Sequence, residues 1–218
     1  MAGLVLTPSE EQIISDELLR PEPLADGSAP ERRIVFGGVS WNHYLAFDKK
    51  LGDDRPGPRL YYLDGELEIM TTSNEHERVK TWIGDFLADY FLELRTEIIA
   101  RGQATMRLTK AGAEPDESWC LGEEKEFPDL VLEIALTSGG INKLEIYRRF
   151  RVPEVWLWRR NKLEIFSLNK AGSYEPARAS KLLPSLDISL LERCPGIRSW
   201  QEARRTFRHG LNKAKKEA

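Results

Sequence analysis

The chain has 218 residues, of which 41% are hydrophobic and 9% aromatic, and these proportions are typical of a folded globular protein. No apolar run approaches the roughly 18 residues that a membrane-spanning helix needs, and the acidic, proline-containing start does not resemble a signal peptide, so we expect a cytoplasmic protein without membrane association. The formal net charge of −3 predicts no general attraction to a polyanion, although a local basic patch can still provide one.

The length favours one main domain with a shorter segment at each end. Residues 1–35 are polar and contain several prolines, so we expect a loosely ordered N-terminal arm. The main domain is predicted over residues 36–195. Residues 196–218 are predicted as a basic tail or helix, because from Arg198 onward there are seven positive and two negative side chains, a net charge of +5. A solvated tail is favoured over a helix that contacts phosphates or an anionic membrane.

The main domain is predicted to begin with a helix. Ser40 is a suitable N-cap for a helix that starts at Trp41, since the apolar residues that follow recur at helical spacing. The proline-containing segment Gly52–Pro58 ends this helix in a loop.

A β-hairpin is the strongest local prediction. Asp64-Gly65 separates two strand-like runs, Leu60–Leu63 and Glu66–Met70, and an Asp-Gly pair favours the type I′ turn that matches strand twist. The two-residue period of a strand puts Glu66 and Glu68 on one face and the apolar residues between them on the other. One face of the hairpin is therefore expected to be core and the other polar or functional.

A long amphipathic helix is predicted next. Asn74, with Glu77 three residues later, resembles a capping box that opens this helix. His76 lies in its first turn, where a histidine is more often a surface or cap residue than a functional one. Two short strands, over Thr96–Ala100 and Ala104–Leu108, are expected to follow with a turn between them.

The run Leu130–Ala135 predicts a central strand that is covered on both faces, because it is almost continuously apolar. Glu133 is the exception, and a carboxylate inside such a strand is costly unless it is paired or binds a metal. A helix over Ile141–Phe150 carries Lys143, for which an exposed position is the commonest outcome. Two more strands are expected over Val155–Trp158 and Leu163–Phe166.

Three of these residues can together support hydrolysis with a divalent metal. Asp116 follows a proline at the predicted mouth of a strand, Glu133 lies inside the central strand, and Lys143 follows ten residues later. Carboxylate oxygens are ligands that Mg²⁺ prefers, and a lysine can orient or stabilise a water that the metal activates. The structural alternatives are a turn or cap aspartate, a glutamate at a solvated edge and an exposed lysine.

The order and spacing of several motifs resemble a known family. These motifs lie between Ser40 and Leu168, and they are Tyr62–Met70, Glu75-His76-Glu77, Glu114-Pro115-Asp116, Pro128–Ile134, Lys143 with Tyr147, and Val152–Trp156. Together they resemble the Uma-type family of restriction endonucleases, a branch of the PD-(D/E)xK nuclease superfamily. The resemblance implies an α/β (α+β) fold, a restriction-endonuclease-like mixed β-sheet flanked by helices, with an N-terminal β-hairpin.

The resemblance also implies roles for the site residues. Asp116 corresponds to the aspartate of the superfamily motif and Glu133 to its acidic partner, and these two are expected to bind Mg²⁺ or Mn²⁺. The lysine that the superfamily places two residues after the glutamate is absent, because Ala135 stands there. Lys143, in the following helix, is similar to a migrated replacement.

Two assignments within the resemblance have competitors. Glu66 and His76 match further positions of the branch, but Glu68 competes with Glu66 because both lie on one face of the strand. Asp129 competes with Asp116 for the motif position. Asp129 and Glu133 are four residues apart on one strand, a separation of about 13 Å that one metal cannot easily span, so Asp116 is preferred.

The sequence therefore predicts a homodimeric, metal-dependent DNA endonuclease. Asp116 and Glu133 hold the metal, Lys143 positions the attacking water, and Glu66 or His76 assists. Dimerisation is expected by analogy with nucleases that cut both strands. Two alternatives stay open: a nuclease-like fold that no longer cuts and acts as a nucleic-acid-binding or assembly module, and a glycosidase that uses a carboxylate pair without a metal.

Overall fold

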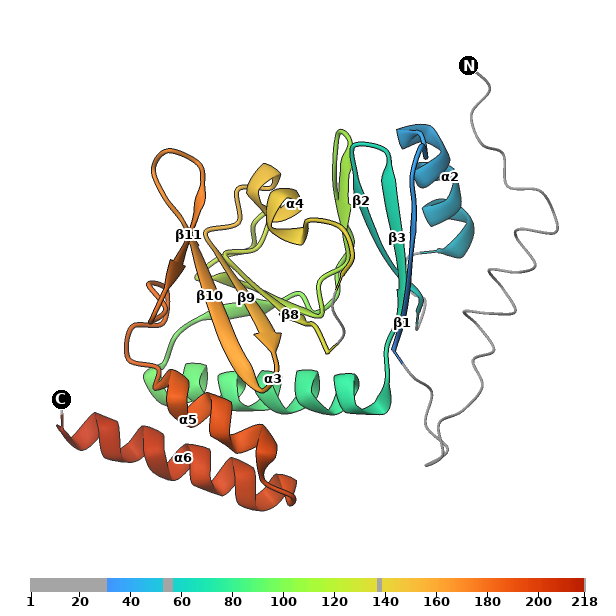
Figure 1. Cartoon of the computed structure of the whole chain (residues 1–218). Helices are drawn as coiled ribbons and strands as arrows, with labels where there is room; N and C mark the ends of the chain where they lie inside the picture. Colours follow the sequence, from blue (N-terminus) through green and yellow to red (C-terminus); the bar gives the residue numbers. More distant parts are fainter. Residues whose placement is uncertain (1–30, 53–56, 137–138, 218) are drawn as a thin grey trace. The chain divides into compact units, whose positions relative to one another are not determined.

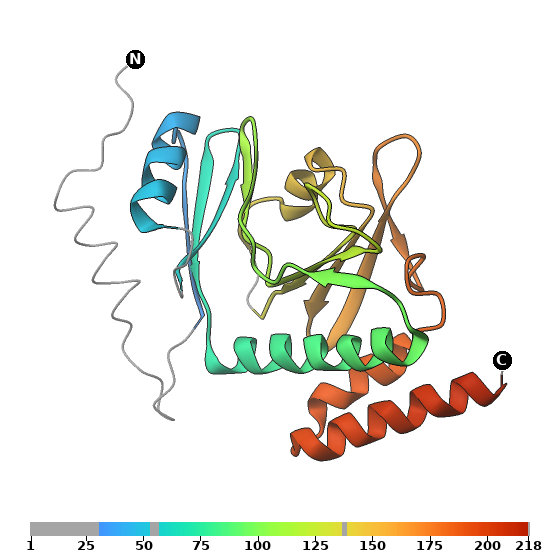
Figure 2. The same cartoon turned by 180° about the vertical axis from the view of Figure 1, so that it is seen from behind.

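The computed structural model describes residues 31–52, 57–136 and 139–217, which form two compact units, each with its own sheet. The first unit holds the described residues up to Glu77, together with Thr105–Glu114 and residues 139–149. The second unit holds Arg78–Ala104, Pro115–Leu136 and the chain from Phe150 onward. Figure 1 shows the order of the elements along the chain, and Figure 2 shows them from behind.

The first unit is built on a five-stranded sheet in the order β1-β3-β2-β6-β5. All neighbouring strands in it are antiparallel. The strands are β1 (Arg32–Phe36), β2 (Arg59–Leu63), β3 (Glu66–Thr71), β5 (Met106–Leu108) and β6 (Ala111–Ala113).

The predicted hairpin is confirmed and lies inside this sheet as β2 and β3. Its turn residues, Asp64 and Gly65, have φ angles of +48° and +104°, which are the left-handed values that a type I′ turn requires. Because β1 pairs with β3 and β6 pairs with β2, the hairpin is the middle of the sheet.

One helix covers each face of this sheet. Helix α2 (Trp41–Leu51) begins at the predicted cap, where the side chain of Ser40 accepts a hydrogen bond from the backbone N–H of His43. Its Tyr44 stacks on Tyr62 of β2 with ring centroids 4.9 Å apart. The short helix α4 (Lys143–Arg149) contacts β2 and β6, and it packs over Tyr61, which points to the opposite face from Tyr62.

The second unit is built on a six-stranded sheet in the order β11-β10-β9-β8-β7-β4. Strands β8 and β9 are parallel, and the other neighbours are antiparallel. The strands are β4 (Ile98–Ala100), β7 (Glu117–Leu121), β8 (Leu130–Ile134), β9 (Glu154–Arg159), β10 (Lys162–Leu168) and β11 (Tyr174–Ala177).

The hydrophobic core of the second unit lies between one face of this sheet and three helices (Figure 1). The helices are α3 (Asn74–Leu94), α5 (Ile188–Arg193) and α6 (Trp200–Glu217), and the 3₁₀ turn η1 (Cys194–Gly196) joins the last two. Leu130, Leu132 and Ile134 of β8 face this core, and Phe86 of α3 stacks on Phe207 of α6.

The predicted α/β (α+β) class is confirmed, but the strands divide between two sheets where a single mixed sheet was expected. The two strands predicted on either side of Gly102 both form, but they do not pair with each other. Strand β4 pairs with β7 in the six-stranded sheet, and β5 pairs with β6 in the five-stranded sheet. Residues 32–35 of the predicted arm form β1 together with Phe36, and this strand pairs with β3, while residues 1–30 lie outside the described chain.

The start of α3 and the conformation of the C-terminal segment also differ from the predictions. The cap of α3 is Ser73, one residue before the predicted Asn74, because the Ser73 hydroxyl accepts a 3.2 Å hydrogen bond from the backbone N–H of His76. The C-terminal basic segment is the helix α6, where a solvated tail had been favoured. Ala203, Phe207 and Leu211 recur at helical spacing and are buried in the core, and this burial offsets the cost of ordering the segment.

Among the described residues, no helix has both the length and the apolar character needed to cross a membrane.

Candidate functional site

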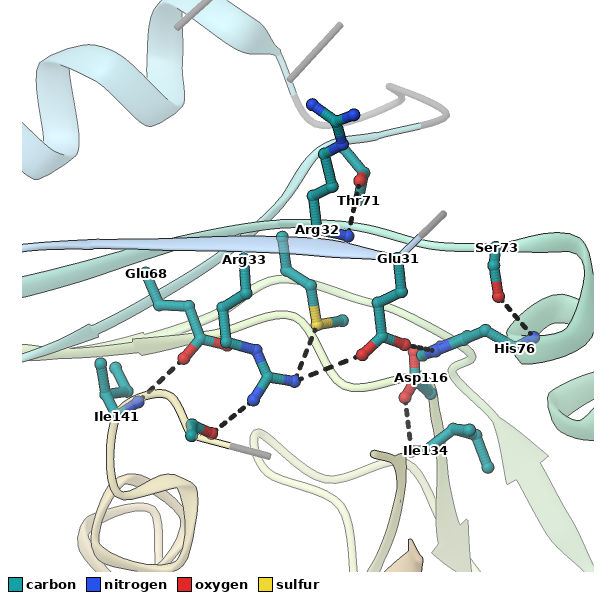
Figure 3. A network of polar contacts seen from close by, with 12 residues as sticks. Glu31, Arg32, Arg33, Glu68, Thr71, Ser73, His76, Asp116, Ile134 and Ile141 are labelled. Carbon is teal, nitrogen blue, oxygen red and sulfur yellow. Dashed lines mark hydrogen bonds and ion pairs between the residues drawn. The ribbon is translucent and has the colours of Figure 1, made fainter. Parts of the chain in front are cut away.

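Asp116 and Glu133 lie at the same end of the β7–β8 strand pair in the second unit. The last residue pair of that ladder is Glu117 with Leu132, Asp116 directly precedes Glu117, and Glu133 directly follows Leu132. The carboxylate of Asp116 accepts a 2.6 Å hydrogen bond from the backbone N–H of Ile134 (Figure 3).

Glu133 points away from the hydrophobic core of its unit. Its neighbours Leu132 and Ile134 face the core beneath the helices, and alternation along the strand turns Glu133 to the other face of the sheet. Glu133 and Asp116 are nevertheless each only 1% exposed. Two ionised carboxylates at such burial are costly unless cations or hydrogen-bond donors compensate them.

The donor chemistry of this pair fits a hard divalent cation. Among the described residues, no group of three or more His, Cys, Asp or Glu side chains is arranged to hold a metal. Mg²⁺ does not require such a cage, because it is usually bound through one or two carboxylates and keeps several waters or substrate phosphate oxygens as its other ligands. Two carboxylates such as those of Asp116 and Glu133 therefore have the donor chemistry that Mg²⁺ or Mn²⁺ takes.

Asp129, the rival for the motif position, has a structural role at the other end of β8. Its carboxylate accepts a hydrogen bond from the backbone N–H of Leu121 at 2.7 Å and two from the ammonium group of Lys125 at 2.7 and 2.9 Å. The hydrogen bond to this carboxylate raises the pKa of Lys125. Asp129 thus holds the connection between β7 and β8, and it is separated from Glu133 by the length of the strand.

Lys143 is the first residue of α4, in the first unit. The preceding Asn142 caps the helix, because its side-chain oxygen accepts a 3.1 Å hydrogen bond from the backbone N–H of Glu145. Lys143 is half-buried, and its Nζ atom lies 3.5 Å from the centre of the Tyr61 ring. This cation–π contact gives the ammonium group a defined position, in contrast to the exposed lysine that is commonest on helices.

The two candidate glutamates of β3 have different surroundings. Glu66 is the first residue of the strand, beside the turn, and is exposed. Glu68 is fully buried, accepts a 2.8 Å hydrogen bond from the backbone N–H of Ile141, and forms an ion pair with Arg33 at 3.3 Å (Figure 3). Both glutamates lie on one face of the strand, as predicted, but only the Glu68 side chain is buried.

His76 is fully buried, whereas a surface or cap position was expected. Its Nδ1 atom lies 2.8 Å from a carboxylate oxygen of Glu31, and Glu31 in turn pairs with Arg33 at 3.6 Å (Figure 3). The first unit therefore contains a buried polar chain that runs from His76 through Glu31 and Arg33 to Glu68.

The structure thus groups the predicted residues by unit: Asp116 and Glu133 together in the second, and Glu66, Glu68, His76 and Lys143 in the first. Glu31 and Arg33 were not predicted as site residues, because both lie in the segment that was expected to be a loosely ordered arm. The apolar run Ile34-Val35-Phe36 directly after them is a strand signal that identifies this part of the chain as ordered. Glu114 was noticed only as part of a motif, and its buried carboxylate accepts hydrogen bonds from the backbone N–H of Leu60 and the hydroxyl of Thr105.

Comparison with known proteins places this arrangement in a family. A crystal structure titled a "putative nuclease belonging to DUF820 from Anabaena variabilis ATCC 29413" is similar in fold, with a TM-score of 0.50 and 12% sequence identity over 78% of this chain and 99% of the other. No curated protein matches the chain significantly. Residues 41–198 match the Uma2 family, whose description is "Putative restriction endonuclease". The chain therefore belongs to the Uma2 family.

Proposed function

We propose that this protein is a metal-dependent endonuclease that hydrolyses phosphodiester bonds in DNA. The observation that carries the proposal is the pair of buried carboxylates, Asp116 and Glu133, at one end of the β7–β8 ladder. The nuclease class is supported by the description of the family to which the chain belongs.

Asp116 and Glu133 are the proposed metal ligands. The hydrogen bond from the backbone N–H of Ile134 orients the Asp116 carboxylate without the help of a bound cation. Such pre-organisation matters because a site that is already oriented loses little entropy on binding. Bound Mg²⁺ or Mn²⁺ supplies a Lewis acid that makes water more acidic and offsets the charge that develops on the phosphate.

Lys143 is the proposed residue that orients the attacking water. An ammonium group offers three hydrogen-bond donors and one positive charge, so it can hold a water or a phosphate oxygen and stabilise a hydroxide. The support for this role is its place in the family motif order and its half-buried ammonium group over Tyr61. Of the assisting residues, Glu66 has the weakest support because it is exposed beside the turn, and buried His76 and Glu68 are more suitable.

Cleavage of supercoiled plasmid by the purified protein, with Mg²⁺ or Mn²⁺ and with EDTA, tests this function. We expect metal-dependent nicking, and we expect Glu133→Gln and Asp116→Asn each to lower kcat at least about 100-fold, the scale on which loss of one electrostatic contributor slows a reaction. Asp129→Asn is the matched control, since it alters a carboxylate at the opposite end of β8 that holds the connection between β7 and β8. Full metal-dependent cleavage by Glu133→Gln would contradict the proposed ligands.

A homodimer is part of the proposal, by analogy with nucleases that cut both strands of a duplex. Light scattering on the eluted peak of a sizing column tests it directly. A mass equal to that of a single 25.0 kDa chain at working concentration would contradict it.

The second candidate function is a nuclease fold that binds nucleic acid without cutting it. The observation in its favour is Ala135, which follows β8 at the position where the superfamily has a lysine. This alternative predicts no cleavage with any divalent metal, and DNA binding that EDTA leaves unchanged. Metal-dependent nicking that Glu133→Gln abolishes would exclude it.

A further inference from the structure

Two charged residues of the five-stranded sheet, buried Glu68 and partly buried Arg33, hold the loop that leads into α4. Glu68 of β3 accepts the 2.8 Å hydrogen bond from the backbone N–H of Ile141. Arg33 of β1 donates a hydrogen bond to the carbonyl oxygen of Gly139 (Figure 3). The side chains of Arg33 and Glu68 are 10% and 0% exposed, and they pair with each other. The sheet therefore hydrogen-bonds to the backbone of the loop at two positions, Gly139 and Ile141.

Gly140, between these two positions, shows how closely the loop lies against the pair. A Cβ atom added there would come 2.2 Å from a carboxylate oxygen of Glu68 and 2.9 Å from the guanidinium nitrogen Nη1 of Arg33. Its φ angle of +94° is also in the range that favours glycine. No other residue type fits at this position without displacement of the loop, of Arg33 or of Glu68.

The loop in turn determines where Lys143 begins its helix. Ile141 is two residues before Lys143, and Asn142 between them caps α4. The ammonium group then lies over Tyr61, which is directly opposite Glu68 in the β2–β3 register. Loop, helix start and ammonium group are thus held on one face of the same sheet.

Arg33 is itself held in place by a second carboxylate. It lies between Glu68 at 3.3 Å and Glu31 at 3.6 Å, and Glu31 also contacts His76 at 2.8 Å. Buried ion pairs are poor sources of net stability, because desolvation offsets most of the attraction. Their directional hydrogen bonds, however, define one geometry for the groups they contact.

We propose that Arg33 and Glu68 are positioning residues for Lys143: by holding the Gly139–Ile141 backbone they set the place of the lysine at the start of α4. This inference rests on the proposed function, in which Lys143 orients the attacking water. It adds two residues to the site, and it assigns Glu68 a role in supporting the lysine, distinct from direct metal binding.

The first experiment needs no activity. In solution NMR spectra of the full chain, the ε-methylene protons of Lys143 are expected upfield, because they lie over the Tyr61 ring, and the Ile141 amide is expected to exchange slowly. In Glu68→Ala and Arg33→Met we expect the upfield shift to collapse and the Ile141 amide to exchange at least tenfold faster. Glu68→Gln keeps an oxygen acceptor and is expected to restore part of both signals.

Asp48→Asn is the matched control for general loosening of the first unit. Asp48 is 1% exposed and pairs with Arg107, whose side chain is 34% exposed, so its substitution also breaks the ion pair of a buried acid in the first unit. We expect Asp48→Asn to leave the Lys143 shift in place. An unchanged Lys143 shift in folded Glu68→Ala and Arg33→Met, or an equal loss in Asp48→Asn, would overturn the positioning role.

The second experiment is a double-mutant cycle in plasmid cleavage. We expect Glu68→Ala to lower kcat about 10- to 100-fold with little change in KM, the range found for residues that orient ligands of a metal site. In the Lys143→Ala background the same substitution is expected to have almost no further effect, because the group it positions is gone. An equal effect in both backgrounds would mean that Glu68 acts independently of Lys143, and would overturn the proposal.

A glycine pair offers an independent check. Gly140→Ala introduces the clash with Arg33 and Glu68, while Gly172→Ala, at a φ of +81° with nothing within 4 Å of its Cβ, introduces backbone strain alone. Only Gly140→Ala is expected to shift Lys143 and lower kcat. If the wild-type protein cuts no DNA, the proposed function fails while the NMR results still decide whether Arg33 and Glu68 position Lys143.

Discussion

Asp116 accepts a 2.6 Å hydrogen bond from the backbone N–H of Ile134, the residue that follows Glu133 on β8. This bond fixes the Asp116 carboxylate to the same strand that carries the second proposed ligand. Both proposed ligands lie next to Glu117 and Leu132, the last residue pair of the β7–β8 ladder. The hydrogen bond to Ile134 thus holds the Asp116 carboxylate at the end of β8 that carries Glu133.

The hydrogen bond to Ile134 predicts different stabilities for two Asp116 variants. Asp116→Ala leaves a buried N–H group without this acceptor, and we expect the free energy of unfolding to fall by roughly 1–3 kcal/mol. Asp116→Asn keeps an oxygen at the same position and is expected to lose less. Urea denaturation of the metal-free protein measures both, and equal losses in the two variants would contradict this role of the carboxylate.

Metal binding is expected to stabilise the wild-type protein. A ligand at 100 times its dissociation constant that binds only the folded state adds about 2.7 kcal/mol, so Tm should rise with Mg²⁺ or Mn²⁺ concentration and return to its starting value with EDTA. Glu133→Gln should not respond in this way, because it removes one of the two proposed ligands. Thermal scans across a metal titration check this, with Asp129→Asn as the control that should respond like wild type. A wild-type Tm independent of both metals would count against the site.

The C-terminal helix is expected to be part of the folded core. Phe207 of α6 is fully buried, and its ring centre lies 5.0 Å from that of Phe86. Phe207→Ala should lower the free energy of unfolding by about 3–5 kcal/mol, the usual cost of removing a buried aromatic ring. Arg205→Ala, at an exposed position of the same helix, should change it by no more than about 0.5 kcal/mol. Denaturant titrations compare them, and a loss below about 1 kcal/mol for Phe207→Ala would place α6 outside the cooperative core.

The far end of α4 predicts a pH-dependent contribution to stability. Arg149 donates hydrogen bonds to both carboxylate oxygens of Asp64 in the hairpin turn, and this contact lowers the pKa of Asp64. Because the folded-state pKa is depressed, the contribution is fully present above the unfolded-state pKa of about 3.9 and is lost as the pH falls through the lower folded-state value. The Asp64 side chain is 52% exposed, so solvent screening limits the contribution to roughly 0.5 kcal/mol.

Comparison of wild type with Asp64→Asn tests this contribution. The difference in the free energy of unfolding should be constant near neutral pH, shrink in acid below the ordinary aspartate pKa, and decrease with added salt. A difference that grew as the pH fell would contradict the ion pair. Both proteins can be followed by urea denaturation at a series of pH values.

Local elements of this protein could be predicted from the amino-acid sequence alone. The Asp64-Gly65 turn and the Ser40 cap specify their conformations through their own backbone preferences and side-chain hydrogen bonds, so the hairpin and α2 were predicted correctly. Burial of Glu133 could be predicted because an uninterrupted apolar run surrounds it in the chain. The family resemblance was carried by the same short motifs, whose order does not depend on tertiary contacts.

The contacts between polar groups could not be predicted in this way, because they join segments that are far apart in the chain. Glu66 and Glu68 lie on the same face of one strand, so periodicity could not separate them; only Glu68 accepts a hydrogen bond from an amide 73 residues away. Asp116 and Asp129 each accept a backbone amide hydrogen bond, from Ile134 and Leu121 respectively, and these distant partners are set by the tertiary structure. The burial of His76 depends on Glu31, 45 residues earlier, in a segment that looked disordered by composition. The physical reason is that a local pattern specifies the face on which a side chain lies. The partner that compensates a buried charge is set by which distant segments pack against that face.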